Sequence, residues 1–380
     1  MIFLELSYKF NNDEKSVLIE RKEFLNPKSV TFYLKDGDSI YVTNNQQVYV
    51  NQLLAVNSLG VKMFSPISGF AQIKGNSVIV ANDNQGTEIS NGESSIQLEK
   101  MTKEEILNIC NSFGIGSGNK SLFNELKENK KILFVNGLDI EPYLFNSQFV
   151  LHENCKNTLD VMTLLYNAFG VIPYIAVSKH DQTDLAQIKS ILANYPYVRL
   201  LEIKETFPKN ELKFILNKYL KEYSDKEILV MDVQTIFKLF VALVDKKPCH
   251  KKKVTVLFNN PMRYYLVDTY YGVNLEEMID SFVPPSWGGK VVYLNNYYRK
   301  NKCMNFDYLT VTDNVNTIFV FDEEADIVTK CINCGKCADV CPVKINPLDT
   351  KLDSSCIRCG LCNYVCPANI NLIVRVKDHG

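Results

Sequence analysis

The sequence predicts a multidomain α/β protein, and three features of the chain support this fold class. Short β segments separated by turn residues occupy residues 30–82, and from about residue 131 apolar strands alternate with amphipathic helices. Eight of the twelve cysteines then lie close together near the C-terminus. With 380 residues, 46% of them hydrophobic, the chain is long enough to bury a core in two or more domains.

The first part of the chain, residues 1–90, is predicted to form a small all-β module. Its β segments are rich in Val, Tyr, Phe and Ile and are separated by Asp, Asn and Gly, which favour turns. We expect strands at 30–34, 39–42, 47–50, 61–64 and 77–81.

Residues 100–250 are predicted to form a parallel sheet covered by helices on both faces, because apolar strands alternate with helical patterns there. The expected strands are 132–135, 174–177, 200–203 and 227–231, and the expected helical faces are 159–169, 185–192 and 236–243. Residues 251–324 are predicted to form a small α+β unit, with strands at 253–258, 264–268, 291–294 and 317–321 and a helix at 275–279.

The charge balance and the N-terminus narrow the class of protein. The net charge is −1, with 42 Lys and Arg against 43 Asp and Glu, so no global excess draws the chain to nucleic acid or anionic lipid. The N-terminus lacks the basic start and long apolar region of a secretory signal, and no apolar run reaches the ~20 residues that cross a bilayer. We expect a cytoplasmic protein that meets a membrane only through a partner. In such a protein cysteines are metal ligands or free thiols rather than disulfides.

Eight cysteines form two runs of the pattern C-x-x-C-x-x-C-x-x-x-C-P. This is the bacterial ferredoxin pattern, in which the fourth cysteine of each run ligates the other cluster. It predicts a C-terminal domain at 325–380 with two 4Fe-4S clusters. The predicted ligands are Cys331, Cys334, Cys337 and Cys366 for the first cluster, and Cys356, Cys359, Cys362 and Cys341 for the second.

Zinc is the alternative metal, because C-x-x-C pairs also suit tetrahedral Zn²⁺. The third close cysteine and the Cys-Pro ending favour iron-sulfur. So do Gly335 and Gly360, which allow the backbone to wrap closely around a cluster. The remaining cysteines are scattered and are assigned no function: Cys110, Cys155, Cys249 and Cys303.

With these motifs in place, the chain resembles the C subunit of the Rnf electron-transport complex and its relatives. These include cobalamin-reductase and proline-reductase-associated proteins. The resemblance covers about residues 30–370, and its most specific part is the segment 135–144, Val-Asn-Gly-Leu-Asp-Ile-Glu-Pro-Tyr-Leu. Segments 65–70 and 228–256 support it. The resemblance implies a barrel-sandwich module at 1–90, an FMN-domain-like unit at 100–250, an SLBB-like β-grasp unit at 251–324 and a ferredoxin-like domain at 325–380.

The resemblance also implies a flavin site. In the family, the parallel-sheet domain binds FMN, takes hydride from NADH and passes single electrons to the clusters. The matching positions here are Gly114, Gly116, Gly118 and Lys120 in the loop 113–120, and the acidic residues Asp139 and Glu141. A plain turn is the alternative interpretation of this loop. Whether the chain is an enzyme stays open.

Three motifs depart from the family pattern. The loop lacks the Phe-Pro-Thr that ends the family's glycine loop, and a Lys-Tyr-Pro-x-Gly motif is reduced to Thr-Phe-Pro-Lys-Asn at 206–210. A glycine-rich motif is replaced by 294–299, which includes Tyr297 and Tyr298. We expect tyrosines to serve packing by default.

The sequence therefore predicts an RnfC-like iron-sulfur protein that relays low-potential electrons through two 4Fe-4S clusters, with a partly eroded flavin and nicotinamide site. The alternative is an active FMN-dependent NADH oxidoreductase that passes electrons from NADH through FMN to the clusters. From residue 330 to the end, five Lys and two Arg stand against four Asp. Lys336, Lys344, Lys351 and Arg358 lie within or between the ligand loops, so we expect an acidic flavodoxin, ferredoxin or reductase-complex subunit as partner.

Overall fold

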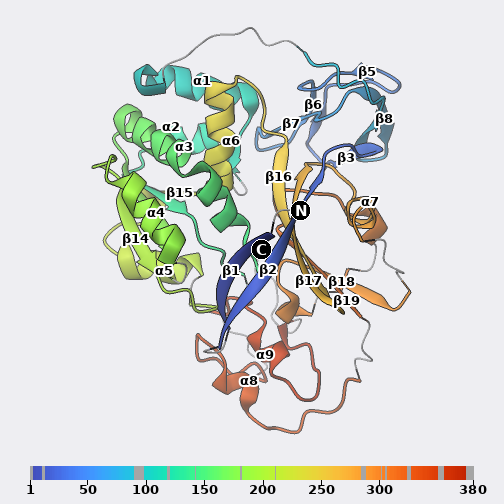
Figure 1. The fold of residues 1–380 in the computed structure, drawn as a ribbon, viewed down its shortest axis with the longest axis vertical. Helices are drawn as coiled ribbons and strands as arrows, with labels where there is room; N and C mark the ends of the chain where they lie inside the picture. Colours follow the sequence, from blue (N-terminus) through green and yellow to red (C-terminus); the bar gives the residue numbers. More distant parts are fainter. Residues whose placement is uncertain are drawn as a thin grey trace.

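The computed structural model describes residues 3–10, 13–89, 98–117, 120–141, 143–179, 182–209, 211–283, 288–300, 302–303, 306–322, 327–349 and 355–373. Figure 1 shows a parallel sheet with its helices, a second, larger sheet beside it, a small β module at the top and the short helices α8 and α9 at the bottom. The larger sheet has six strands. The predicted multidomain α/β fold is confirmed by these separate sheets.

The parallel sheet has the strand order β14-β13-β12-β15, and every neighbouring pair is parallel. Its strands are β12 (Ile132–Asn136), β13 (Ile172–Ser178), β14 (Arg199–Ile203) and β15 (Ile228–Asp232). All five residues of β12 are buried. Successive side chains of a strand point to opposite faces, so β12 is covered on both faces. Leu133 and Val135 join one core, and Ile132 and Phe134 join another.

Helices pack against the parallel sheet and contribute side chains to both cores. The first core receives α1 (Lys103–Phe113), α2 (Leu122–Lys127), α3 (Asn146–Phe169), α4 (Gln182–Leu192) and α6 (Val233–Val244), and the second receives α5 (Leu212–Tyr219). Among the described residues, no helix is both long enough and apolar enough to span a bilayer.

The small β module consists of two sheets. The first pairs β3 (Ser29–Tyr33), β9 (Ser77–Asn82), β8 (Gly69–Lys74) and β5 (Gln47–Val48), and the second pairs β4 (Ser39–Ile40), β6 (Leu53–Val56) and β7 (Lys62–Phe64). The sequence did not predict β6 or β8. At the start of β8 a Cβ on Gly69 would lie 1.7 Å from the carbonyl oxygen of Ala81, so this pairing requires glycine.

The six-stranded sheet corrects the prediction that residues 1–90 form one module. Its strand order is β1 (Phe3–Phe10), β2 (Asp13–Phe24), β17 (Met262–Tyr270), β16 (Lys251–Asn259), β19 (Thr317–Asp322) and β18 (Lys290–Leu294). Residues 3–24 thus join this sheet, where β2 runs parallel to β17. The physical reason is burial, since Ile19 packs fully buried against Leu266 and Phe319. The helix α7 (Leu275–Asp280) lies beside this sheet.

Buried polar contacts fix the parallel sheet against the six-stranded sheet. Asn146, at the start of α3, donates from Nδ2 to the carbonyl of Asn316 at 2.7 Å. Its Oδ1 accepts from the Thr255 hydroxyl at 2.7 Å. The bond to Thr255 is buried and the bond to Asn316 is partly buried, so they orient α3 and the loop that precedes it. That loop carries Asp139 and Glu141.

Candidate metal centre

The two cysteine runs fold alike. Each contains a one-turn helix, α8 (Lys336–Asp339) or α9 (Leu361–Tyr364), whose first turn follows a glycine with positive φ. These glycines are Gly335 (φ 76°) and Gly360 (φ 90°). Two residues earlier, Asn333 and Arg358 also have positive φ, 55° and 56°. The same strained turn therefore occurs twice, which wraps three cysteines around one side of a hollow.

Four cysteines line each of two hollows, and in each the fourth cysteine comes from the other run. The inner pocket is lined by Cys341, Cys356, Cys359 and Cys362, together with the apolar side chains of Val343, Ile345, Ile357, Leu372 and Ile373. The outer pocket is lined by Cys331, Cys334, Cys337 and Cys366, with Ile332, Leu348, Ile370 and Leu372. The structure thus brings together the same two sets of cysteines that the sequence groups by crossed ligation.

The donor chemistry of both pockets fits a 4Fe-4S cluster, which needs four thiolates arranged around it. The backbone N–H of Asn333 lies 3.4 Å from the sulfur of Cys331 and donates to it. In the inner pocket burial, and then the neighbouring thiols, raise the pKa of Cys362 to about 12. A bound cation reverses this, because a coordinating thiol is deprotonated. Within the described residues, no group of three or more His, Cys, Asp or Glu side chains converges closely enough to hold a single metal ion.

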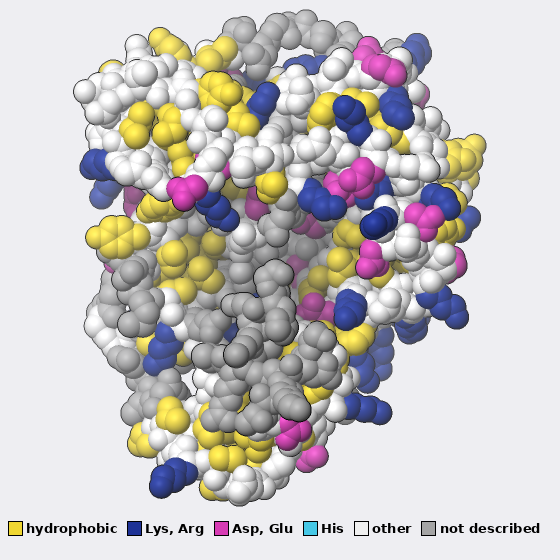
Figure 2. Space-filling model, turned by 180° about the vertical axis from the view of Figure 1, so that it is seen from behind, with side chains coloured by type: hydrophobic (Ala, Val, Ile, Leu, Met, Phe, Trp, Pro, Cys, Tyr) yellow, Lys and Arg dark blue, Asp and Glu magenta, His cyan; other side chains and the backbone are white. Residues whose placement is uncertain are grey.

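The two pockets differ in exposure. One cysteine of each pocket is buried, Cys337 in the outer and Cys359 in the inner. Two cysteines of the outer pocket, Cys331 and Cys334, are exposed, whereas the other three of the inner pocket are only partly exposed. Around the outer pocket the apolar side chains of Ile327, Val328 and Ile332 are 72%, 63% and 67% exposed. Figure 2 shows hydrophobic side chains beside scattered Lys, Arg and acidic residues at this lower end of the molecule. The outer pocket is therefore the more exposed of the two.

The second cysteine run, which lines most of the inner pocket, packs against a tight turn, η3 (Tyr297–Arg299), that follows β18. Asn296, just before this turn, donates from Nδ2 to the carbonyl of Cys359 at 3.0 Å. In return Asn363 of α9 donates from Nδ2 to the carbonyl of Arg299 at 3.1 Å. Both amides are buried, so these bonds hold the second cysteine run against the six-stranded sheet.

Aromatic side chains fill the space between the inner pocket and the parallel sheet. Tyr298 is 2% exposed, and its ring lies 4.5 Å from that of Tyr364 and 5.7 Å from that of Phe207, measured between centroids. Tyr297 packs against Phe319 of β19 at 5.7 Å. The tyrosines that replace the family's glycines are therefore packed side chains.

Glu141 connects this region to the inner pocket. Its Oε1 lies 3.3 Å from Nη2 of Arg299, and Nε of Arg299 donates to the carbonyl of Arg358 at 2.9 Å. Burial raises the pKa of Glu141 to about 7, although the charge of Arg299 acts in the opposite direction. The predicted site residue thus faces a guanidinium that is bonded to the cysteine loop.

Asp139 has a structural role. Its carboxylate accepts from the backbone N–H groups of Ser147 (2.9 Å) and Gln148 (3.1 Å), which belong to the first turn of α3. The first N–H groups of a helix lack partners within the helix, so this buried carboxylate caps α3. Burial raises the pKa of Asp139 to about 6.

Glu205, which lies beside Asp139, was not predicted from the sequence as a site residue. Burial raises the pKa of Glu205 to about 7, and the charge of Asp139 acts in the same direction. Glu205 follows β14 closely, as Asp139 follows β12. The carboxyl ends of parallel strands meet at one edge of a sheet, so a polar residue directly after a predicted strand was the signal that could have found it.

The glycine loop makes other contacts. Gly114 ends α1 in the left-handed conformation, and its carbonyl accepts from the backbone of Lys62 in the small β module. Gly116 belongs to a two-residue strand that pairs with Lys120 and Ser121, and Lys120 forms an ion pair of 2.7 Å with Glu125. Gly118 lies outside the described residues. The described part of the loop therefore contacts the small β module and α2, and the bonds described above for Asp139 and Glu141 involve other partners.

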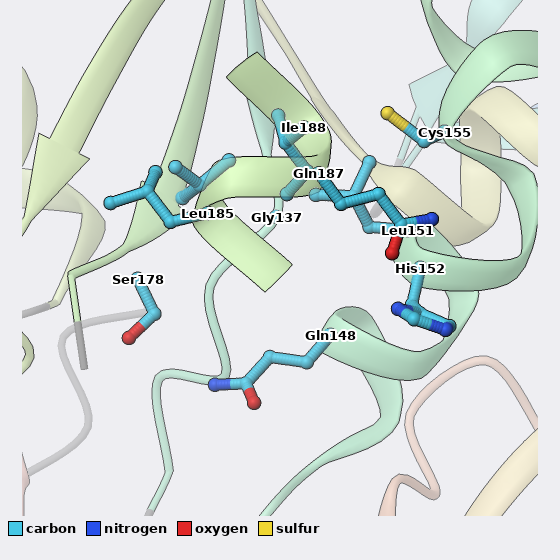
Figure 3. Close-up of a pocket in the computed structure, with 10 residues that line it drawn as sticks. Gly137, Gln148, Leu151, His152, Cys155, Ser178, Leu185, Gln187 and Ile188 are labelled. Carbon is cyan, nitrogen blue, oxygen red and sulfur yellow. The ribbon is translucent and has the colours of Figure 1, made fainter. Parts of the chain in front are cut away.

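A small cavity lies at the carboxyl ends of β12 and β13, between α3 and α4 (Figure 3). Gly137 and Ser178 line it from the strands, and Gln148, His152 and Cys155 line it from α3. Burial raises the pKa of Cys155 to about 11, so its thiol is protonated at neutral pH.

Comparison with known proteins supports the metal centre. Residues 327–345 match the family described as 4Fe-4S binding domain. The chain is 22% identical to the C subunit of the ion-translocating oxidoreductase complex of Buchnera aphidicola subsp. Acyrthosiphon pisum, over 66% of this chain and 56% of the relative. It is also 22% identical to the C subunit of the Na(+)-translocating ferredoxin:NAD(+) oxidoreductase complex of Acetobacterium woodii, over 66% of this chain and 61% of the relative.

These matches confirm the resemblance to the C subunit of the Rnf complex and the iron-sulfur module predicted from the cysteine runs. The chain spans somewhat more than half the length of these two relatives. Among solved structures, a crystal structure of NAD+-reducing [NiFe]-hydrogenase in the H2-reduced state is similar, at 13% identity and a TM-score of 0.48, over 58% of this chain and 47% of that one. That similarity is too low to define the fold.

Proposed function

We propose that this chain is an RnfC-like electron carrier of the cytoplasm. It relays low-potential electrons through two 4Fe-4S clusters, held by the inner and the outer pocket. The observation that supports this most directly is the grouping of eight cysteines into two sets of four, each completed by a cysteine from the opposite run. When bound, such clusters supply one-electron transfer without bond making or breaking.

The order of transfer follows from exposure. The inner pocket is enclosed between η3 and the cysteine loops, where Cys359 is buried. The outer pocket exposes Cys331 and Cys334. Electron transfer between proteins requires close approach, so we propose the outer cluster as the one that exchanges electrons with the partner and the inner cluster as its connection to the rest of the chain.

The proposed partner is an acidic redox protein. Lys336 and Lys344 are exposed beside the pockets, and Lys351 lies outside the described residues. Basic side chains around an exposed apolar patch favour an acidic flavodoxin, ferredoxin or reductase-complex subunit. The relatives are named as subunits of complexes, which supports a partner that is part of an assembly.

We further propose that flavin binding is weak or lost. The described part of the glycine loop contacts Lys62 and Glu125, and Asp139 caps α3. Tyr298 fills space between α9 and the segment that contains Phe207. These contacts use the groups that the family pattern assigns to FMN.

Anaerobic purification followed by metal, sulfide and flavin analysis tests the proposal. We expect about eight iron and eight acid-labile sulfide per chain. We also expect well under one flavin, and cluster absorbance that dithionite bleaches but NADH does not. Stoichiometric zinc with little sulfide would contradict the iron-sulfur function. Near-stoichiometric FMN with rapid reduction by NADH would instead support the alternative, an FMN-dependent NADH oxidoreductase.

A further inference from the structure

We infer that the Glu141–Arg299 ion pair couples protonation at the carboxyl end of β12 to reduction of the cluster in the inner pocket, so that Glu141 takes up a proton when this cluster is reduced. This inference rests on the function proposed above, because it requires a 4Fe-4S cluster in the inner pocket. It assigns Glu141 the role of a proton acceptor and Arg299 the role of a positioning residue.

The first support is a continuous chain of polar contacts. Glu141 Oε1 pairs with Nη2 of Arg299, and Nε of the same guanidinium donates to the carbonyl of Arg358. Arg358 stands between two ligands of the inner pocket, Cys356 and Cys359. One rigid planar cation therefore touches both the carboxylate and the cysteine loop.

The second support is the state of the carboxylate. Its second oxygen, Oε2, is buried and has no hydrogen-bond partner among the described residues. A buried carboxylate with one unsatisfied oxygen is costly in its charged form and gains by accepting a proton. Burial accordingly raises the pKa of Glu141 to about 7.

The charged groups that act on Glu141, within the described residues, oppose each other. Arg299 of η3 favours the carboxylate, whereas Glu211, at the start of α5, disfavours it. The ionisable Tyr143 follows on the same loop, and burial raises its pKa. Arg299 is thus the cation that favours the ionised form of Glu141 against the effect of burial.

Reduction changes this balance. A low-potential electron donor would add one electron to the inner cluster, which would become more negative by one charge. The added charge attracts Arg299 and lowers the electrostatic potential at Glu141, so the pKa of Glu141 rises. A proton from water then binds the carboxylate and compensates the charge. The enclosed position of the inner pocket makes the effect larger than it would be in bulk water.

The sign of the pH effect follows. Burial raises the pKa of Glu141 to about 7 in the chain without a cluster. At a pH below the pKa of Glu141 in the oxidised protein, the carboxyl is protonated in both redox states and the midpoint potential does not depend on pH. Between the pKa of the oxidised form and the higher pKa of the reduced form, the oxidised protein holds a carboxylate and the reduced protein a carboxylic acid. The midpoint potential should therefore fall as pH rises, by no more than about 59 mV for each tenfold change in proton concentration.

The test is an EPR-monitored redox titration of the full chain, loaded with clusters, from about pH 6 to about pH 9. We expect the inner-cluster potential of the wild type to fall with pH, and that of Glu141→Gln to be independent of pH. Arg299→Gln should move the sloping region to higher pH because the carboxylate loses its cation. Arg299→Lys keeps the charge and should keep the slope. The control, Arg199→Gln, changes an arginine on β14 that contacts Tyr174 and should behave as the wild type.

Two results would overturn the inference: a wild-type potential that is flat over the whole pH range, or a slope that survives in Glu141→Gln. Both are distinct from failure of the proposed function, because iron and sulfide analysis of the same samples shows whether the clusters are present. If Arg299→Gln fails to fold, Glu141→Gln and Arg299→Lys still decide the question.

Discussion

Gly360 and Tyr298 are in direct backbone contact: a Cβ on Gly360 would lie 2.7 Å from the carbonyl carbon of Tyr298. The equivalent glycine of the first run, Gly335, has no atom of the described residues, its chain neighbours apart, within 4 Å of its Cβ position. The backbone of the second cysteine run therefore packs directly against the backbone of η3. The first run has no such contact at its equivalent glycine among the described residues.

This contact predicts different effects for two matched substitutions. Both glycines have positive φ, so alanine at either position costs about 1–2 kcal/mol in backbone strain. Gly360→Ala should cost more than Gly335→Ala, because it also separates α9 from η3. Thermal unfolding of the two cluster-loaded variants measures the difference, and equal losses would contradict the docking of the inner pocket on η3.

Crossed ligation predicts which cluster each variant loses. Cys341→Ser lies in the first run but should damage the inner cluster, whose other three cysteines belong to the second run. Cys366→Ser should damage the outer cluster. EPR of the two variants distinguishes the clusters. Loss of the outer cluster in Cys341→Ser would show that each run binds its own cluster.

An ion-pair network joins α3 to the six-stranded sheet, and we expect it to stabilise the folded protein. Glu153 of α3 pairs with Arg21 of β2 and with Lys253 of β16, and both cations also pair with Asp268. These side chains are 10–28% exposed, so the network is partly shielded from water. Glu153→Gln should lower the free energy of unfolding by on the order of 1–2 kcal/mol, between the values for surface and buried pairs.

The control for that network is Glu202→Gln, which removes the more exposed pair with Lys189. Its effect should stay near zero to 0.5 kcal/mol, as roughly expected for surface pairs. Denaturant unfolding measures both variants. Equal effects would mean that α3 and the sheet are held by apolar contacts and the Asn146 bonds alone.

Stability should fall as pH rises because of Glu205. The pKa of this carboxyl is raised from 4.5 to about 7 in the folded protein, so the folded state binds its proton more tightly than the unfolded state. Its contribution is complete below about pH 4.5 and is lost as pH rises through about 7. Glu205→Gln should flatten this part of the stability curve, at about 1.4 kcal/mol for each unit of pKa shift removed.

Glu227 is the control for this pH profile, because its pKa is shifted in the opposite direction from that of Glu205. Ion pairing with Lys131 and bonds from Ser224 lower the pKa of Glu227 to about 2, so its contribution is lost only as pH falls through that value. Glu227→Gln should leave the profile between pH 4.5 and 7 unchanged. A wild-type stability that rises over this interval would contradict the burial of Glu205.

Docking of an acidic partner predicts a dependence on salt. Electron transfer to an acidic ferredoxin should slow as ionic strength rises, since the Debye length is already about 8 Å at 0.15 M salt. Lys336→Glu, beside the outer pocket, should slow it further, whereas Lys74→Glu on the small β module should not. Stopped-flow rates at low and high salt test this. An electron-transfer rate that changes neither with ionic strength nor in Lys336→Glu would show that the partner docks elsewhere.

The sequence by itself determined the strands of the parallel sheet and the candidate metal ligands. The expected strands of the parallel sheet agree with β12 to β15 to within a few residues, because apolar runs alternate there with helical patterns. The cysteine spacing determined both sets of ligand candidates, since the pattern repeats twice and spacing is a local property of the chain. Each of these inferences needed only neighbouring residues.

Tertiary structure alone decided the rest, because it depends on contacts between distant residues. Nothing near Ile19 indicates that β2 pairs with β17, and nothing near Arg299 indicates that its guanidinium joins Glu141 to Arg358. Asp139 matched a flavin-site pattern in the sequence, yet its carboxylate is used by the N–H groups of α3. A carboxylate that is buried must satisfy whichever donors the fold brings to it, and only the packed chain shows which donors these are.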